Sequence, residues 1–269
     1  MKKTLILLFL FSQNAYSNEK SIVRIYKQWH LLAKTKTLDI DKSKSLPQYK
    51  NQTFIYTELD KLIANKKVKA IISEGCEGEI NTQFDSTYNG WNYKNLDSKK
   101  KTKQFKDILT LVPLKLEVKY KAKLMTMCGD NLSLIEKNAL ASSDLNGYIG
   151  YYTRLKQYKD TNNKKYQLYK KSLLDGVDKK IDNPVEYARI RAKKSLSAFR
   201  RYTQERNDYF VRAIIKNIDK KPAVVIGGVH LADLTMKLKD KDIKYEIVEV
   251  EGYPKDSETI YDDIEKILN

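Results

Sequence analysis

The sequence has few histidines, few cysteines and few long apolar runs. These shortages limit the disulfide bonds, metal-binding motifs and membrane helices that the chain can contain. Only two of its 269 residues are histidines, His30 and His230, and only two are cysteines, Cys76 and Cys128. Two cysteines allow at most one disulfide bond within the chain. The H-E-x-x-H pattern of helical zinc proteases is absent. Beyond the first residues, no apolar run approaches the roughly 20 residues that a membrane helix needs.

The N-terminal segment MKKTLILLFLFSQNAYS has the three parts of a secretory signal peptide. Lys2 and Lys3 supply positive charge, residues 4–11 are apolar, and Ala15-Tyr16-Ser17 places small residues at a cleavage site. We therefore predict cleavage after Ser17 and an exported protein, periplasmic or secreted from a bacterium. The mature chain would then be residues 18–269, without a transmembrane helix.

The chain is strongly basic, with a formal net charge of +17, which falls to +15 when the two lysines of the export segment are removed. Such a charge favours anionic partners, for example a polymer or lipid headgroup of the cell envelope. The basic residues are dispersed, however, and SKKKTK (98–103) is the main run, which favours a solvated lysine-rich surface. We predict no nucleic-acid partner, because no binding motif is recognisable and the export signal argues against one.

Five apolar runs of strand length alternate with segments of helical period. The runs are IVRIY (22–26), VKAIIS (68–73), KLMTM (123–127), PAVVIGG (222–228) and KYEIVEV (244–250). Between the first two, the segment 53–67 places apolar residues on one helical face: Ile55, Leu59, Leu62 and Ile63. This alternation predicts a single α/β domain over residues 18–269, with a mostly parallel central sheet flanked by helices.

No strand signal appears between about residues 131 and 220, so we predict a long helical insertion before the last two strands. Asn183-Pro184 followed by Glu186 is typical of a helix start. Asparagine is a preferred N-cap residue, proline fits the first helical position, and an acidic residue is favourable in the first turn. A helical pattern runs from there toward Ile218. The tyrosine- and lysine-rich segment 147–171 is also predicted to be helical, with an interruption near residues 161–163.

Polar residues follow four of the predicted strands at the point where each strand ends. His30 follows the first strand, Glu74 the second, Asp130 the third and His230, in GGVH, the fourth. Because ligands of open α/β sheets bind at the carboxyl edge of the strands, we expect these four side chains to share one site. For Glu74 and Asp130 there is an alternative, in which each caps a helix or lies in a solvated turn.

Arg206 lies in the predicted helix that contains RYTQERNDYFVRAI (201–214). Four apolar or aromatic residues share its stripe on the helix: Phe199, Tyr202, Phe210 and Ala213. A guanidinium on such a face needs a carboxylate or an anionic ligand. We expect an ion pair with Glu74 or Asp130, contact with a substrate carboxylate, or both.

Together these residues resemble the Tiki/TraB/GumN-like proteins and their wider clan, which includes the erythromycin esterases and ChaN-like proteins. GGVHLADL, which contains His230, is similar to the second G-x-x-H motif of the clan, and Gln204-Glu205-Arg206-Asn207 to its E-R-N/D motif. Glu74 matches a glutamate that ends an early strand. His30, in KQWH, takes the place of the first G-x-x-H histidine, although Lys27 stands where the family usually has glycine.

The resemblance spans about residues 22 to 250 and implies a site without settling its reaction. Tiki-type members are proposed divalent-metal-dependent peptidases, erythromycin esterases are thought to hydrolyse without a metal, and ChaN-like relatives are linked to haem or iron. We expect a hydrolase of a peptide or ester bond in which His30, His230 and Glu74 bind zinc, manganese or cobalt. Glu74 is a ligand or general base, and Arg206 orients Glu74 or the substrate.

Three alternatives stay open. In a metal-free hydrolase, one histidine oriented by Glu74 takes a proton from water and the other stabilises the oxyanion. In a binding protein, the site holds iron, haem or an anionic envelope ligand, and tyrosines of the insertion contact sugars instead of packing the insertion against the sheet. Lys27 also leaves open a hydrolase fold that has lost its activity.

Cys76 and Cys128 both lie within two residues of the same predicted edge. Because an exported protein folds in an oxidising compartment, we favour a disulfide between them. A Cys–His nucleophile pair, thiolate ligation of a metal and two unrelated buried thiols are the alternatives.

Overall fold

Six strands form one sheet in the order β3-β4-β2-β5-β1-β6. The computed structural model describes residues 21–29, 46–75, 77–78, 112–120, 123–177, 180–254 and 260–269. The strands are β1 (Val23–Lys27), β2 (Ala70–Ser73), β3 (Glu77–Gly78), β4 (Met125–Gly129), β5 (Ala223–Ile226) and β6 (Tyr245–Val248). All neighbouring strands pair in parallel except β3, which is antiparallel to β4. The predicted fold class is confirmed.

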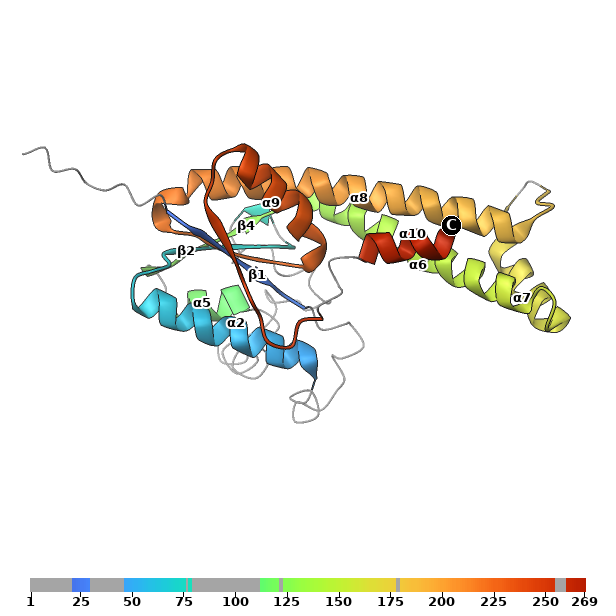
Figure 1. Cartoon of the computed structure of the whole chain (residues 1–269), viewed down its shortest axis with the longest axis horizontal. Helices are drawn as coiled ribbons and strands as arrows, with labels where there is room; N and C mark the ends of the chain where they lie inside the picture. The colour runs from blue at the N-terminus through green and yellow to red at the C-terminus, as the bar shows by residue number, and fades with distance from the viewer. Residues whose placement is uncertain are drawn as a thin grey trace, which may run out of the picture.

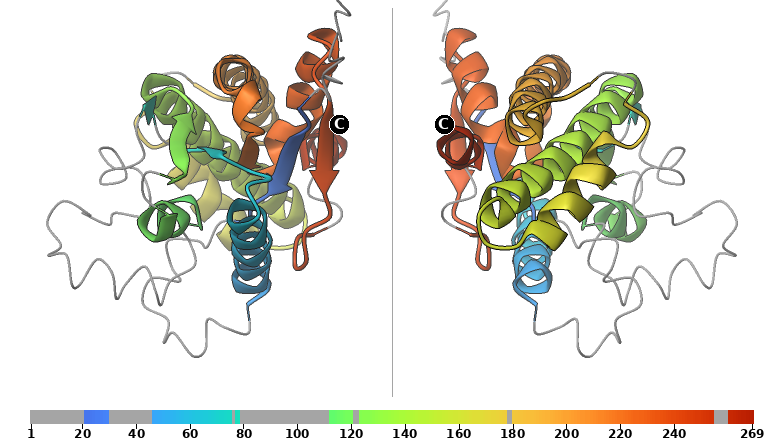
Figure 2. Two further views of the ribbon diagram at one scale, coloured as in Figure 1. Left: turned by 90° about the vertical axis from the view of Figure 1, so that its left-hand side faces the viewer. Right: turned by 90° about the vertical axis from the view of Figure 1, so that its right-hand side faces the viewer.

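Helices cover both faces of this sheet (Figure 1). They are α2 (Pro47–Ala64), α5 (Val112–Tyr120), α6 (Leu132–Tyr158), α7 (Asn163–Leu174), α8 (Pro184–Lys216), α9 (Leu231–Asp240) and α10 (Ile260–Leu268), with the 3₁₀ turns η5 (Ile218–Lys220) and η6 (Gly228–His230). Figure 2 shows α2 and α5 on one side of the sheet and α8 and α9 on the other. None of the helices within the described residues is long and apolar enough to cross a membrane.

The central strand β5 shows why the sheet has two cores. All four of its residues are buried. Ala223 and Val225 pack into the cluster under α2 and α5, and Val224 and Ile226 pack into the cluster under α8 and α9. Successive side chains of a strand point to opposite faces, so a strand covered on both sides is apolar throughout.

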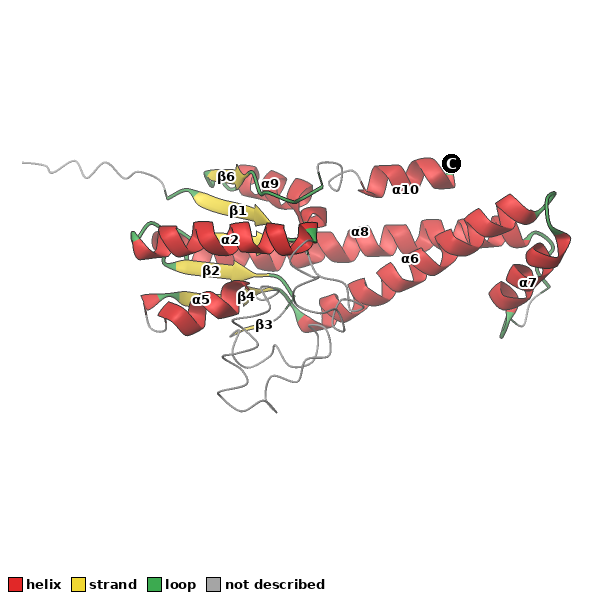
Figure 3. Ribbon diagram, turned by 90° about the horizontal axis from the view of Figure 1, so that it is seen from below, coloured by secondary structure: helices red, strands yellow, loops and turns green. Residues whose placement is uncertain are grey.

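The chain between β4 and β5 forms the predicted helical insertion. Asn183 caps α8 by accepting a hydrogen bond from the Glu186 N–H at 3.1 Å, and α6 and α7 are separated at residues 159–162. We call α6, α7 and residues 184–200 of α8 the arm, which extends beyond the sheet (Figure 3). The arm has its own core, built around Leu145, Leu155, Ala188 and Ala192.

The tyrosines of segment 147–171 belong to this third core. Tyr148, Tyr151, Tyr152, Tyr166 and Tyr169 pack among the helices of the arm. The interpretation that they pack the insertion against the sheet is therefore wrong. The sequence of the segment alone does not tell which element its tyrosines pack against.

The start of α2 and the presence of β3 differ from the sequence prediction for local reasons. α2 begins at Pro47, before the expected residue 53, because proline suits the first turn of a helix. β3 has only two residues, too few to show any periodicity. Residues 1–20 lie outside the described residues, so the signal peptide stays a prediction.

The connections after β2 and β5 leave the sheet in opposite directions. After β2 the chain continues toward the β4 end of the strand order. After β5 it passes β1 and continues to β6, at the opposite end of the sheet. β2 and β5 are neighbours, so the point where the strand order reverses lies between them. In open α/β sheets, the carboxyl edge at such a switch point is where ligands bind.

Candidate functional site

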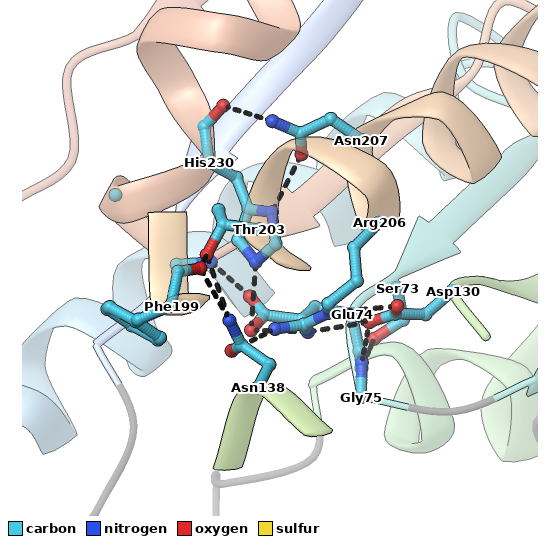
Figure 4. A network of polar contacts seen from close by, with 12 residues as sticks. Ser73, Glu74, Gly75, Asp130, Asn138, Phe199, Thr203, Arg206, Asn207 and His230 are labelled. Atoms are coloured by element: carbon cyan, nitrogen blue, oxygen red, sulfur yellow. Dashed lines mark hydrogen bonds and ion pairs between the residues drawn. The ribbon is translucent and has the colours of Figure 1, made fainter. Parts of the chain in front are cut away.

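Glu74 stands at this switch point, directly after β2. Its N–H donates to the Val225 carbonyl at 3.1 Å, so the residue is tied to β5 by its backbone. Its side chain, 13% exposed, is held at both oxygens: Oε2 accepts from the Gly227 N–H, and Oε1 accepts from Arg206 Nη2 at 3.2 Å. A carboxylate anchored in this way keeps a fixed direction (Figure 4).

Arg206 is buried beneath Glu74 and uses all three of its nitrogens. Nε donates to Asp130 Oδ1 at 2.9 Å, Nη2 to Asp130 Oδ2 at 2.6 Å, and Nη1 to Asn138 Oδ1 at 2.9 Å. Burial acts to lower the pKa of Arg206, but the hydrogen bonds to Asp130 and the charge of Glu74 outweigh it and raise the pKa above its usual value. The guanidinium is therefore permanently charged and pairs with both candidate carboxylates.

Asp130 lies in this network and does not cap a helix. Its carboxylate is fully buried and accepts from the Gly75 N–H at 3.2 Å and the Asn131 N–H at 2.9 Å, in addition to Arg206. The N-cap of α6 is the next residue, Asn131, whose side chain accepts from the Leu134 N–H. Asp130 and Glu74 therefore share the guanidinium of Arg206.

His230 ends η6 and lies above Glu74, with its side chain fully buried. Its Nδ1 is 2.7 Å from Asn207 Oδ1. The orientation of the Asn207 amide is fixed because its Nδ2 donates to the His230 carbonyl at 3.1 Å and to Asp233 Oδ2 at 2.9 Å. Oδ1 must then accept, so Nδ1 carries a hydrogen, and in the neutral ring Nε2 has the lone pair.

Nε2 of His230 has no hydrogen-bond partner, although it is buried in the part of the chain that the structure describes. It lies 3.4 Å from Glu74 Oε1, which is close enough for charge interaction but lacks hydrogen-bond geometry. The Phe210 ring packs against the imidazole in a T-shaped arrangement, with ring centroids 5.5 Å apart. A lone pair facing an anchored carboxylate oxygen is an arrangement that favours a proton or a cation between the two atoms.

The same two atoms fit part of a metal site. Bonds of about 2.1 Å to one ion would place two tetrahedral ligands at about this separation, and a histidine that donates its other N–H to a fixed oxygen is the usual metal ligand. Among the described residues, no group of three or more His, Cys, Asp or Glu side chains could hold an ion. His30, the predicted third ligand, lies outside the described residues.

The glycines of GGVH allow two backbone N–H groups to reach side chains. A Cβ at Gly227 would lie 3.2 Å from Glu74 Oε2, and a Cβ at Gly228 would overlap the Tyr253 hydroxyl. The Gly228 N–H donates to that hydroxyl at 2.8 Å. Tyr253 comes from the loop after β6, and no sequence signal identified it.

The end of β1 is clamped by two buried amides of α2. Asn51 accepts from the Trp29 N–H at 2.8 Å and donates to the Lys27 carbonyl at 3.0 Å, and Gln52 donates to the Trp29 carbonyl at 2.8 Å. Lys27 itself is buried, with its ammonium 5.4 Å from the centroid of the Tyr253 ring. The backbone that leads into His30 is thus fixed, and a lysine occupies the space beside it.

The structure therefore brings together Glu74, Asp130, Arg206 and His230. Sequence reasoning missed Asn207 as the partner of His230, although it quoted the residue in the E-R-N motif. It also missed Asn138, which donates to Thr203 and accepts from Arg206. Cys128 is disulfide-bonded, while Cys76 lies outside the described residues, so their pairing stays a prediction.

Comparisons of the chain with protein-family models, with curated proteins and with solved structures give no significant match. Function is therefore inferred from the geometry of these residues.

Proposed function

We propose that this chain is a hydrolase of peptide or ester bonds whose reaction takes place between His230 and Glu74. One observation carries the proposal: a fully buried histidine, with its tautomer fixed by Asn207, directs an unpartnered Nε2 toward an anchored carboxylate. A purely structural histidine would be expected to use both ring nitrogens, because a buried polar atom without a partner costs free energy.

Each residue has a distinct role in this proposal. The lone pair of Nε2 accepts a proton from the attacking water, and Glu74, 3.4 Å away, stabilises the imidazolium that forms. Arg206 and the Gly227 N–H hold Glu74 in place. Because Arg206 is saturated and buried, its geometry supports positioning of Glu74 and not direct contact with a substrate carboxylate.

A divalent ion, zinc, manganese or cobalt, fits the same pair of donors. His230 Nε2 and Glu74 Oε1 would hold it, with His30 as the predicted third ligand. The ion would lower the pKa of its bound water and polarise the substrate carbonyl. In that version the Nδ1–H of His230 and the anchoring of Glu74 fix the two ligands, so the surrounding network serves either chemistry.

The test is hydrolysis of a panel of fluorogenic peptides and aryl esters by the wild-type chain and by His230→Gln and Glu74→Gln. The proposal predicts that kcat/KM falls by about 100-fold or more in both variants, the usual range for a general base. Lys239→Gln, an exposed position on the helix that follows His230, is the matched control and should keep full activity. Unfolding midpoints of all variants show whether any loss reflects folding.

A chelator separates the two versions. Activity that disappears on chelation and returns with zinc, manganese or cobalt supports the metal-dependent hydrolase, and activity that persists supports the metal-free one. If the wild-type chain turns over no substrate with or without these ions, the hydrolase proposal is wrong. Tight binding of iron, haem or an anionic envelope fragment without turnover would then make it a binding protein.

A further inference from the structure

The outer end of the arm is strongly basic. Seven basic residues lie in the last turns of α6, in the connection that follows it and in α7, and the single acid among them is Asp160. The seven are Arg154, Lys156, Lys159, Lys164, Lys165, Lys170 and Lys171. All except the half-buried Lys170 are exposed. We call these residues together with Leu168 the tip patch.

No described carboxylate forms an ion pair with any base of the tip patch. Some basic side chains elsewhere are neutralised, for example Lys119 by Asp60 at 2.6 Å and Lys237 by Asp233 at 3.0 Å. Three of the tip-patch cations lie over tyrosine rings, which stabilise a cation without neutralising it. Arg154 is 5.3 Å from the centroid of Tyr169, and Lys165 is 4.9 Å from that of Tyr158.

Leu168 stands in the middle of this charge with 63% of its surface exposed. On α7 its neighbours at i−4, i−3 and i+3 are Lys164, Lys165 and Lys171. A leucine surrounded by lysines on an outward helix face is the composition of a helix that lies on a membrane. The apolar side chain reaches the acyl boundary while the ammonium groups contact headgroups.

We infer that the tip patch binds the surface of an anionic phospholipid bilayer. A soluble polyanion would be attracted by the same charge, but it gives no role to an exposed leucine. Nor are the tyrosines well placed to stack on bases or sugars, because Tyr158 and Tyr169 stack on each other with centroids 5.9 Å apart and also carry cations. Each base held near an anionic leaflet contributes up to roughly fivefold in binding constant.

The position of the tip patch sets the distance between the membrane and the sheet. α7 lies at the end of the arm that is farthest from the sheet (Figures 1 and 3). α8 has 33 residues and Arg206 is the 23rd of them, so the Glu74–His230 pair lies about 30 Å along this helix from the arm's outer end. Docking by the tip patch would leave that site free, and the inference does not depend on the proposed hydrolysis.

The test is co-sedimentation of the full chain with vesicles of phosphatidylcholine, with or without about one third phosphatidylglycerol. The tip variant is Lys164→Glu/Lys165→Glu/Lys171→Glu. The matched control, Lys67→Glu/Lys69→Glu/Lys244→Glu, makes the same change in net charge at exposed lysines of the sheet region. Circular dichroism and unfolding midpoints establish that both fold as the wild type does.

We expect the wild type to bind anionic vesicles and the tip variant to lose at least tenfold in affinity, while the control changes by less than threefold. Leu168→Ser should weaken binding severalfold with no change in charge. Equal losses in the tip and control variants would overturn the inference, because binding would then follow net charge alone. It would also be overturned by a wild type that binds heparin or an oligonucleotide through the tip patch but does not bind vesicles.

Discussion

At the carboxyl edge of the sheet, one guanidinium and two carboxylates are enclosed and hydrogen-bonded, whereas at the tip of the arm seven bases lack any described ion pair. At the sheet edge, Asp130 and Glu74 each lie within 3.2 Å of Arg206. The arm separates its cations on exposed helix faces and covers its tyrosines with them. The comparison indicates that the first cluster fixes geometry, and the second is available to a partner from outside.

Removal of Arg206 tests the enclosed cluster and should have the largest effect. Arg206→Met leaves Asp130 and Glu74 buried without their counter-charge, and breaking such a pair costs about 3–5 kcal/mol of unfolding free energy. Denaturant unfolding measures this loss. Arg206→Lys should not restore it, because an ammonium cannot reproduce the donors of the guanidinium fork.

The matched control is Arg201→Met on the same helix. Arg201 is 62% exposed and lies 3.7 Å from Glu205, so its loss should cost less than about 1 kcal/mol. Similar costs for Arg201→Met and Arg206→Met would contradict the distinction between enclosed and exposed charge.

Alanine substitutions at two glycines compare how tightly the sheet edge and the arm are packed. A Cβ at Gly129, at the end of β4, would lie 2.5 Å from Ile72 Cγ2 and from Phe210 Cδ1. Gly129→Ala should therefore destabilise the protein by about 1–3 kcal/mol through overpacking. It should also reduce any activity, because the Phe210 ring packs against His230.

Gly147, inside α6 of the arm, has open space where a Cβ would be placed. Gly147→Ala should stabilise the protein by about 0.5–1 kcal/mol, because glycine is a poor residue for a helix interior. Thermal unfolding of the two variants gives opposite shifts on this account. A higher unfolding midpoint for both variants would show that packing at the sheet edge is looser than the contacts of Gly129 indicate, and a lower midpoint for both would show that the Gly147 position is not open.

Most of the fold could be predicted because its signals are local. The strand β5 is apolar on both faces, α8 begins with an asparagine cap and a proline, and both patterns are complete within a few residues. Glu74, Asp130 and His230 were found in the same way, since each follows a strand. The parallel sheet then brings the ends of those strands to one edge.

The parts of the site that sequence reasoning missed depend on contacts between distant elements. Asn51, Gln52 and Asn138 are polar residues on helices, where an exposed side chain is the ordinary expectation, yet each is buried against a backbone or a charge. Tyr253 reaches Gly228 from the loop after the last strand. The direction of the Asn207 amide, which fixes the proton on His230, depends on Asp233 one helix away.

The most direct measurement is the tautomer of His230 by nitrogen-15 NMR of histidine-labelled protein. The chain has only two histidines, so His30→Ala assigns both rings in one comparison. We expect the neutral His230 ring to carry its proton on Nδ1 and to keep Nε2 bare, with Asn207→Leu abolishing this preference. A neutral ring protonated on Nε2 in the wild type would contradict the account, because that nitrogen could then neither accept a proton from water nor bind an ion.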